Sequence, residues 1–211
     1  MSIFDWFRAK PPADPAPRDE AAATALRDAE AQARRDVRAG YLTLDEVREQ
    51  AVEAYGEEVE ARALTPMVAW AVDAEARAIR EEQRRWPAVT DHDRLQAAFA
   101  TLEADRGIVA RENFTCCNTC GHGEIGDEIA QVEQAGLPVR GYAFFHAQDT
   151  EAAVEGHGLF LSFGAVDGTP EGDAMVARDV VATLEGSGLA PEWDGDIGRR
   201  VFLPLDWKRR I

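Results

Sequence analysis

The residues best suited to chemistry in this chain are its cysteines, because all three fall within five positions. A histidine follows closely, in the order Cys116, Cys117, Cys120 and His122. Cysteines that only fill space in a core have no reason to gather in one short segment. The cluster predicts a metal site, a redox-active thiol pair or a nucleophile. Packing of a helix start by buried thiols is the simplest interpretation without chemistry.

Zinc is the metal that these residue types favour, since soft thiolates and imidazole suit a tetrahedral zinc ion. Cys117, Cys120 and His122 form a Cys-x-x-Cys-x-His run, and Cys116 adds a fourth donor. Structural zinc sites usually draw their ligands from two separate loops, and the side chains of adjacent cysteines are expected to diverge. A distant histidine would then complete the site, and the candidates are His92, His146 and His157.

Two thiol chemistries use the same segment. Cys117 and Cys120 have Cys-x-x-Cys spacing at an expected helix N-terminus, where backbone amides and the helix dipole favour a thiolate. Three acidic side chains within the next two turns oppose additional negative charge. In the nucleophilic interpretation, His146 activates Cys117 or Cys120, and Asp149 orients the imidazole.

The expected elements place the cysteines where a strand passes into a helix. A strand is predicted over residues 108–114, and the helix after the cysteines ends at Gly136. Asp149 or Thr150 is expected to cap a later short helix. The remaining strands are expected over 139–146, 158–163, 189–193 and 201–205, and the remaining helices of this part over 91–102, 150–155 and 170–186.

The preceding part of the chain, residues 19–86, predicts a helical unit rich in Ala, Glu, Arg and Gln. Thr43 and Glu46 have the spacing of a capping box. Thr65-Pro66 is expected to start a third helix, with threonine as the cap and proline at the first helical position.

Together these patterns predict an α+β protein in three parts. Residues 1–18 are expected to form a flexible N-terminus and a proline-rich linker. Residues 19–86 form the helical unit. Residues 87–211 form an α/β-type domain with a mixed sheet of about five strands and helices packed on it.

The net charge of −16, from 39 acidic and 23 basic residues, disfavours nucleic acid and anionic membrane surfaces as partners. A basic protein partner is compatible with this charge, and the oligomeric state is left open. No stretch approaches the roughly 20 apolar residues that span a bilayer. The odd number of cysteines and the lack of a signal peptide predict a cytoplasmic protein.

Two motifs carry a resemblance to a known family. Asn113 to Gly121 reads NFTCCNTCG, and Gly141 to Glu151 reads GYAFFHAQDTE. With these motifs, roughly residues 85–210 resemble an uncharacterised bacterial family, a domain of unknown function common in actinobacteria. The resemblance implies no activity or cofactor. It suggests that the cysteine segment and the segment from His146 to Asp149 belong to one site.

The residues therefore leave two hypotheses about function. The first is a non-enzymatic binding or interaction module, whose cysteine cluster is structural or holds a metal ion such as zinc. The alternative is a thiol-dependent enzyme, a hydrolase or redox protein, that uses Cys117 or Cys120 with His146 and Asp149.

Overall fold

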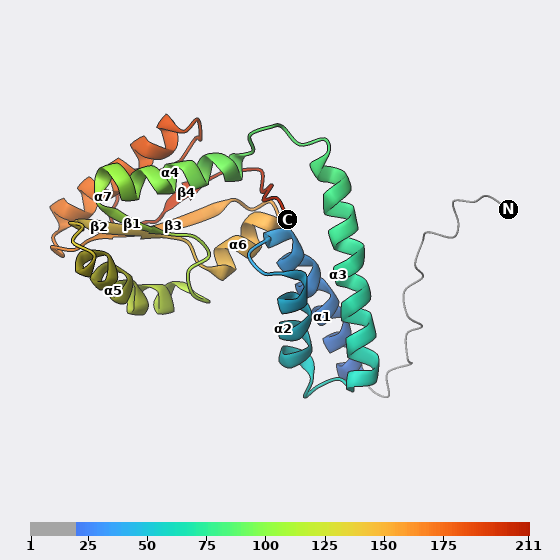
Figure 1. Ribbon diagram of the computed structural model, residues 1–211. Helices are drawn as coiled ribbons and strands as arrows, with labels where there is room; N and C mark the ends of the chain where they lie inside the picture. Colours follow the sequence, from blue (N-terminus) through green and yellow to red (C-terminus); the bar gives the residue numbers. More distant parts are fainter. Residues whose placement is uncertain (1–19) are drawn as a thin grey trace. The chain divides into compact units, whose positions relative to one another are not determined.

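The computed structural model describes residues 20–211 (Figure 1). The predicted flexible N-terminus and linker over 1–18 lie outside the described residues. The chain divides into two compact units, one that ends at Arg85 and also includes Arg210 and Ile211, and one that runs from Trp86 to Arg209. Helices pack on a mixed sheet in the second unit, so the predicted α+β class is confirmed.

The first unit consists of helices α1 (Glu20–Ala39), α2 (Leu44–Tyr55) and α3 (Ala61–Gln83). Each of the three helices packs against the other two. Many of their buried side chains are small, which lets the helix axes approach closely. The fully buried members of this core are Ala29, Ala33, Val47, Leu64, Val68 and Val72.

The start of α2 confirms the predicted capping box. The Thr43 side chain accepts a hydrogen bond from the Glu46 amide, and the Glu46 carboxylate accepts one from the Thr43 amide at 2.7 Å. The predicted helix start at Thr65-Pro66 is wrong, because α3 begins at Ala61 and Pro66 is its sixth residue. Burial of Leu64 and Val68 beside the proline offsets the hydrogen bond that proline cannot donate.

The second unit contains four strands and four helices. In chain order they are α4 (Asp91–Arg106), β1 (Ile108–Arg111), α5 (Asn118–Gln134), β2 (Gly141–Phe144), α6 (Ala147–Val154), β3 (Leu159–Ala165), α7 (Pro170–Gly186) and β4 (Val201–Leu203). The strands form one sheet in the order β1-β2-β3-β4. β1 and β2 are parallel, and the other two pairings are antiparallel.

The fourth of the five predicted strands, over residues 189–193, is not a strand in the structure. This segment contributes a single bridge, in which the amides and carbonyls of Glu192 and Phe202 exchange hydrogen bonds of 2.7 and 3.0 Å. Pro191 lacks an N–H to donate to a ladder, and Gly195 turns the chain with a φ of 88°. The pairing with β4 therefore cannot extend.

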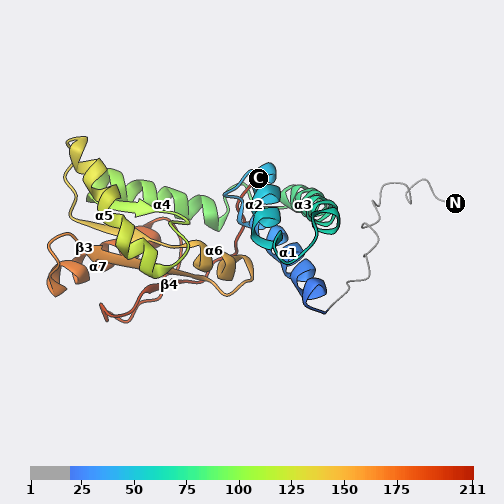
Figure 2. The ribbon, with the colours of Figure 1, turned by 90° about the horizontal axis from the view of Figure 1, so that it is seen from below.

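Helices cover both faces of the sheet, as Figures 1 and 2 show. α4 and α7 pack against each other and against one face, where α4 contacts β1 and α7 contacts β2 and β3. α5 lies on the opposite face and contacts β1 and β2. α5 is thus the crossover that parallel strands require between β1 and β2.

The position of α5 depends on one glycine. A Cβ atom on Gly121 would lie 2.6 Å from the Cζ atom of Phe144, which is too close for a real contact. Phe144 is fully buried in a small core with Val109 and Ile125, so its ring has no room to move. The first turn of α5 therefore sits directly on the aromatic ring.

We predict that Gly121→Ala lowers the free energy of unfolding by about 1–2 kcal/mol, because overpacking outweighs the helix propensity of alanine. The matched control is Gly126→Ala in the same helix, where nothing lies within 4 Å of an added Cβ. That variant should gain about 0.5–1 kcal/mol. Urea unfolding of both variants checks the prediction, and a stabilised Gly121→Ala protein would contradict it.

Candidate functional site

The candidate site lies at the carboxyl edge of the parallel strands. Because β1 and β2 run in the same direction, the helices that follow them begin at the same edge of the sheet. The N-cap of α5 is Cys117, and the N-cap of α6 is His146. α/β proteins commonly bind ligands at this edge.

Hydrogen bonds join the cysteine segment to the His146 segment. The Phe114 amide donates to the Phe145 carbonyl at 2.8 Å, and the Ala147 amide donates to the Thr115 carbonyl at 3.0 Å. The Thr150 hydroxyl also donates to the Asn113 side chain at 2.8 Å. The chain thus holds the loop before α5 against the start of α6.

This loop contains the two non-glycine residues with positive φ in the described chain. Asn113 has a φ of 49°, which asparagine tolerates, and Thr115 has a φ of 59°, which is unusual for a β-branched residue. The hydrogen bonds of the Thr115 carbonyl to Ala147 and of its hydroxyl to the Cys117 carbonyl, at 3.2 Å, stabilise this conformation. Strained backbone of this kind is concentrated at functional sites.

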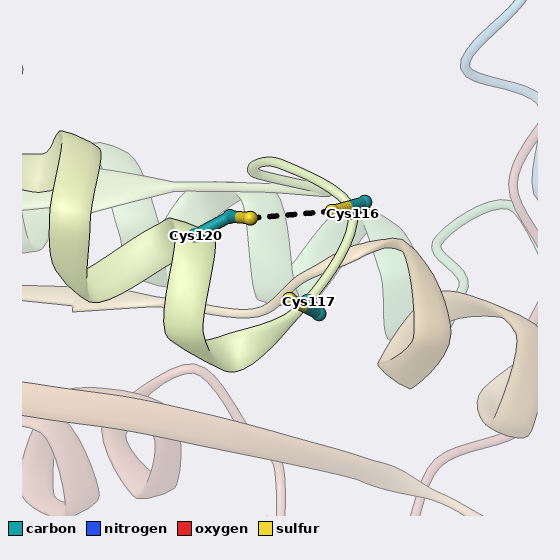
Figure 3. A group of neighbouring side chains, drawn as sticks. All are labelled: Cys116, Cys117 and Cys120. Atoms are coloured by element: carbon teal, nitrogen blue, oxygen red, sulfur yellow. Dashed lines mark hydrogen bonds between the residues drawn. The ribbon is translucent and has the colours of Figure 1, made fainter.

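The three cysteines converge on one point, as Figure 3 shows. Their sulfur atoms all lie within 4.8 Å of one another, and the Sγ atoms of Cys116 and Cys120 are 3.5 Å apart. The expectation that the adjacent Cys116 and Cys117 side chains diverge is therefore wrong. Cys117 is the N-cap of α5, and Cys120 in the first turn of this helix meets the side chains of the adjacent pair.

None of the cysteines is a buried apolar side chain. All three are free thiols, with Cys116 exposed and the other two half-buried. The interpretation that the thiols pack a helix start within the core is thus contradicted, because solvent reaches the cluster. The aromatic and aliphatic residues beneath α5 form that core instead.

The pKa values of Cys117 and Cys120 shift in opposite directions because the thiols lie close together. The backbone N–H of Cys120 lowers the pKa of Cys117, and hydrogen bonds from the thiols of Cys120 and Cys116 lower it further. Hydrogen bonding to Cys116 and then to Cys117 raises the pKa of Cys120 to about 12. Three thiolates so close together repel one another, so a bound cation would favour their joint ionisation.

We predict that Cys117 is alkylated before Cys120 in the metal-free protein. A lower pKa leaves more of the Cys117 thiol as the reactive thiolate at pH 8. Brief treatment with iodoacetamide followed by tandem mass spectrometry of the peptide measures the order. Faster labelling of Cys120 would contradict the assigned acidities.

His122 lies outside the sulfur cluster. Its Nδ1 atom is 3.1 Å from the Tyr142 hydroxyl, and its ring packs edge-on against Phe144 at 5.2 Å between centroids. Desolvation lowers the pKa of His122, and the positive charge of Arg200 lowers it further. Among residues 20–211, the groups of metal-ligating side chains include only the three cysteines.

His146 and Asp149 form a buried pair. The prediction that Asp149 or Thr150 caps α6 is wrong, because His146 is the N-cap. Its Nδ1 atom accepts from the Asp149 amide at 3.3 Å, while its Nε2 atom lies 3.0 Å from the Asp149 carboxylate. Both ring nitrogens thus have partners, and within the described chain neither hydrogen-bonds to a cysteine.

Arg200 contacts both His146 and Asp149. Nothing in the sequence indicated that it belongs to this site. Its Nη1 atom donates to the two carboxylate oxygens of Asp149 at 3.0 and 2.9 Å, and its guanidinium lies 5.0 Å from the ring centre of Phe160. Arg200 is 54 positions beyond His146. Only the pairing of β3 with β4 brings it here, so no local motif could reveal it.

The unfolding free energy should fall as the pH falls below about 6.5, the usual pKa of histidine. Burial lowers the pKa of His146, and Arg200 lowers it further against the opposing effect of Asp149. The unfolded chain therefore binds a proton before the folded protein does. Substituting His146→Asn replaces the capping nitrogen with an amide oxygen that can also cap α6, and it should reduce this pH dependence between pH 7 and pH 5. Identical dependence in both proteins, measured by urea unfolding, would refute the assignment.

The comparison with known families identifies the class of protein. Residues 22–211 match the family model described as a domain of unknown function (DUF6891). The match spans most of the chain, so the protein belongs to this family. Neither a curated protein nor a solved structure matches the chain. Within residues 20–211, no helix has the length and apolar character to cross a membrane.

Proposed function

We propose that the protein is a metal-binding module whose Cys116, Cys117 and Cys120 thiolates hold one zinc ion. The observation that supports this proposal is the convergence of the three sulfur atoms within 4.8 Å of one another. Thiolates are preferred ligands of zinc, and the exposure of Cys116 gives the ion a path from solvent.

The spacing of the sulfurs supports a tetrahedral ion. With zinc–sulfur bonds of about 2.3 Å, two ligands of a tetrahedral site lie about 3.8 Å apart. The Cys116 and Cys120 sulfurs are 3.5 Å apart, and neither of their distances to Cys117 exceeds 4.8 Å. Only small side-chain rotations would therefore separate this arrangement from a zinc site.

Electrostatics also favour the binding of zinc by the three cysteines. Three thiolates and a divalent zinc ion carry a net charge of −1, and this charge would lie at the N-terminus of α5, where the helix dipole is positive. Binding would release the protons of the thiols, including that of Cys120, whose pKa is about 12. Zinc affinity should consequently weaken as the pH falls.

Three protein ligands leave the fourth position of the ion to water or an exchangeable donor. Structural zinc sites are closed by four protein ligands, whereas sites with three are open. The described residues offer no histidine or carboxylate within the sulfur cluster. This supports a module that exchanges its metal or presents it to another molecule.

Purification without chelators, followed by elemental analysis, should find one zinc ion per chain. Each substitution of a cysteine by serine removes a thiolate and should lower the zinc affinity by on the order of a hundredfold. The variants are Cys116→Ser, Cys117→Ser and Cys120→Ser, and competition with a chromogenic chelator measures the affinity. His122→Asn is the matched control, and its affinity should stay within about threefold of the original. Less than stoichiometric zinc, or a large effect of His122→Asn, would reject the three-thiolate site.

Thiol chemistry at Cys117 is the second candidate function. Its support is the lowered pKa of this thiol at the N-cap of α5, with Cys120 as a partner. Because the His146 ring is bound by Asp149 and Arg200, a redox reaction fits better than base-assisted hydrolysis. Catalysed reduction of insulin disulfides that requires Cys117 would favour this candidate. If the protein does not catalyse this reaction, metal binding remains as the proposed function.

We further propose a cytoplasmic location and a basic protein partner. The free thiols suit a reducing compartment. The net charge of −16 would attract a positively charged surface over long range.

A further inference from the structure

We propose that the cysteine cluster is also a redox switch, in which a peroxide oxidises Cys116 and Cys120 to a disulfide and thereby expels the metal. The disulfide itself requires only the thiols. The metal release rests on the proposed zinc site. The switch gives Cys116 a role that the Cys-x-x-Cys motif alone would not assign.

The choice of partners follows from geometry. The sulfurs of Cys116 and Cys120 are 3.5 Å apart and already in hydrogen-bond contact, as the dashed line in Figure 3 marks. A disulfide bond is about 2.05 Å long, so the two atoms need to approach by only about 1.5 Å. We take as partners the pair whose sulfurs are 3.5 Å apart, and the Cys117 sulfur lies within 4.8 Å of both.

The location of the pair allows both access and movement. Cys116 is exposed and lies before the helix, whereas Cys120 is the third residue of α5. Rotation of the Cys116 side chain can close the gap without shifting Gly121, which the Phe144 ring holds in place. A peroxide in solvent can reach this sulfur directly.

The reaction balances with peroxide as the only oxidant. One sulfur of the pair attacks a peroxide oxygen, the oxygen–oxygen bond breaks, and the products are a sulfenic acid and water. The second sulfur then attacks the sulfenic sulfur and displaces a second water. In total two thiols and one hydrogen peroxide give one disulfide and two water molecules.

Oxidation would dismantle the metal site. The disulfide sulfurs are no longer thiolates, so the zinc would keep only Cys117 of its three protein ligands. A single thiolate cannot compete with water and small chelators for the ion. Zinc should therefore leave in a ratio of one ion per disulfide formed.

The first test uses metal-free protein, so that it does not depend on zinc. After treatment with hydrogen peroxide, remaining thiols are alkylated in denaturant, and the peptide that follows Arg111 is sequenced by tandem mass spectrometry. We expect the loss of two hydrogens, reversal by dithiothreitol, and an alkyl group on Cys117 alone. An alkyl group on Cys116 would instead identify a Cys117–Cys120 disulfide and overturn the proposal, as would the absence of a disulfide.

The variant Cys117→Ser provides the control, because it should still lose both thiols reversibly. Failure of this variant to form a disulfide would make Cys117 a partner and refute the assignment. The second test follows zinc release from the loaded protein with a chromogenic chelator. If the disulfide forms but the protein never bound zinc, the zinc proposal fails and the switch in the thiols stands. If zinc stays bound after the disulfide forms, the release mechanism fails.

Discussion

The location of the cysteine cluster depends on the contact between Gly121 and the ring of Phe144. This contact is possible only because glycine has no side chain, and it places the first turn of α5 directly against β2. Phe144 in turn is fixed by the buried residues around it, Val109 from β1 and Ile125 from α5. The sheet, the crossover helix and the thiols at its N-terminus therefore form one mechanically linked structure.

A second set of interactions holds the neighbouring helix start. Asp149 is almost fully buried, yet its carboxylate interacts with His146 and accepts two hydrogen bonds from Arg200, so its charge is compensated. Through the hydrogen bond between Ala147 and Thr115, this network also restrains the loop that carries the cysteines. The residues that resemble a catalytic pair thus act on the thiols through the backbone, by keeping the loop in its bent conformation.

Local signals in the sequence predict local features well, and the capping box at Thr43 is an example. The same signals fail where contacts between residues that are distant in the sequence determine the local structure. Pro66 lies inside a helix because buried neighbours on α3 outweigh its cost, and Arg200 reaches Asp149 only through strand pairing. The cysteine cluster was predictable from the positions of the three cysteines in the sequence. The approach of the Cys116 and Cys117 sulfurs to within 4.8 Å was not predictable, because the backbone between two neighbouring residues decides where their side chains point, and no motif fixes it here.

Zinc X-ray absorption spectroscopy of the loaded protein tests the central claim most directly, because it counts the ligands around the ion. Three sulfur atoms at about 2.3 Å and one lighter atom at about 2.0 Å are the expected result. That result would place Cys116, Cys117 and Cys120 on the metal. Two sulfurs accompanied by the scattering pattern of an imidazole would indicate His122 instead, and a shell of oxygen atoms alone would show that the cysteines do not hold zinc.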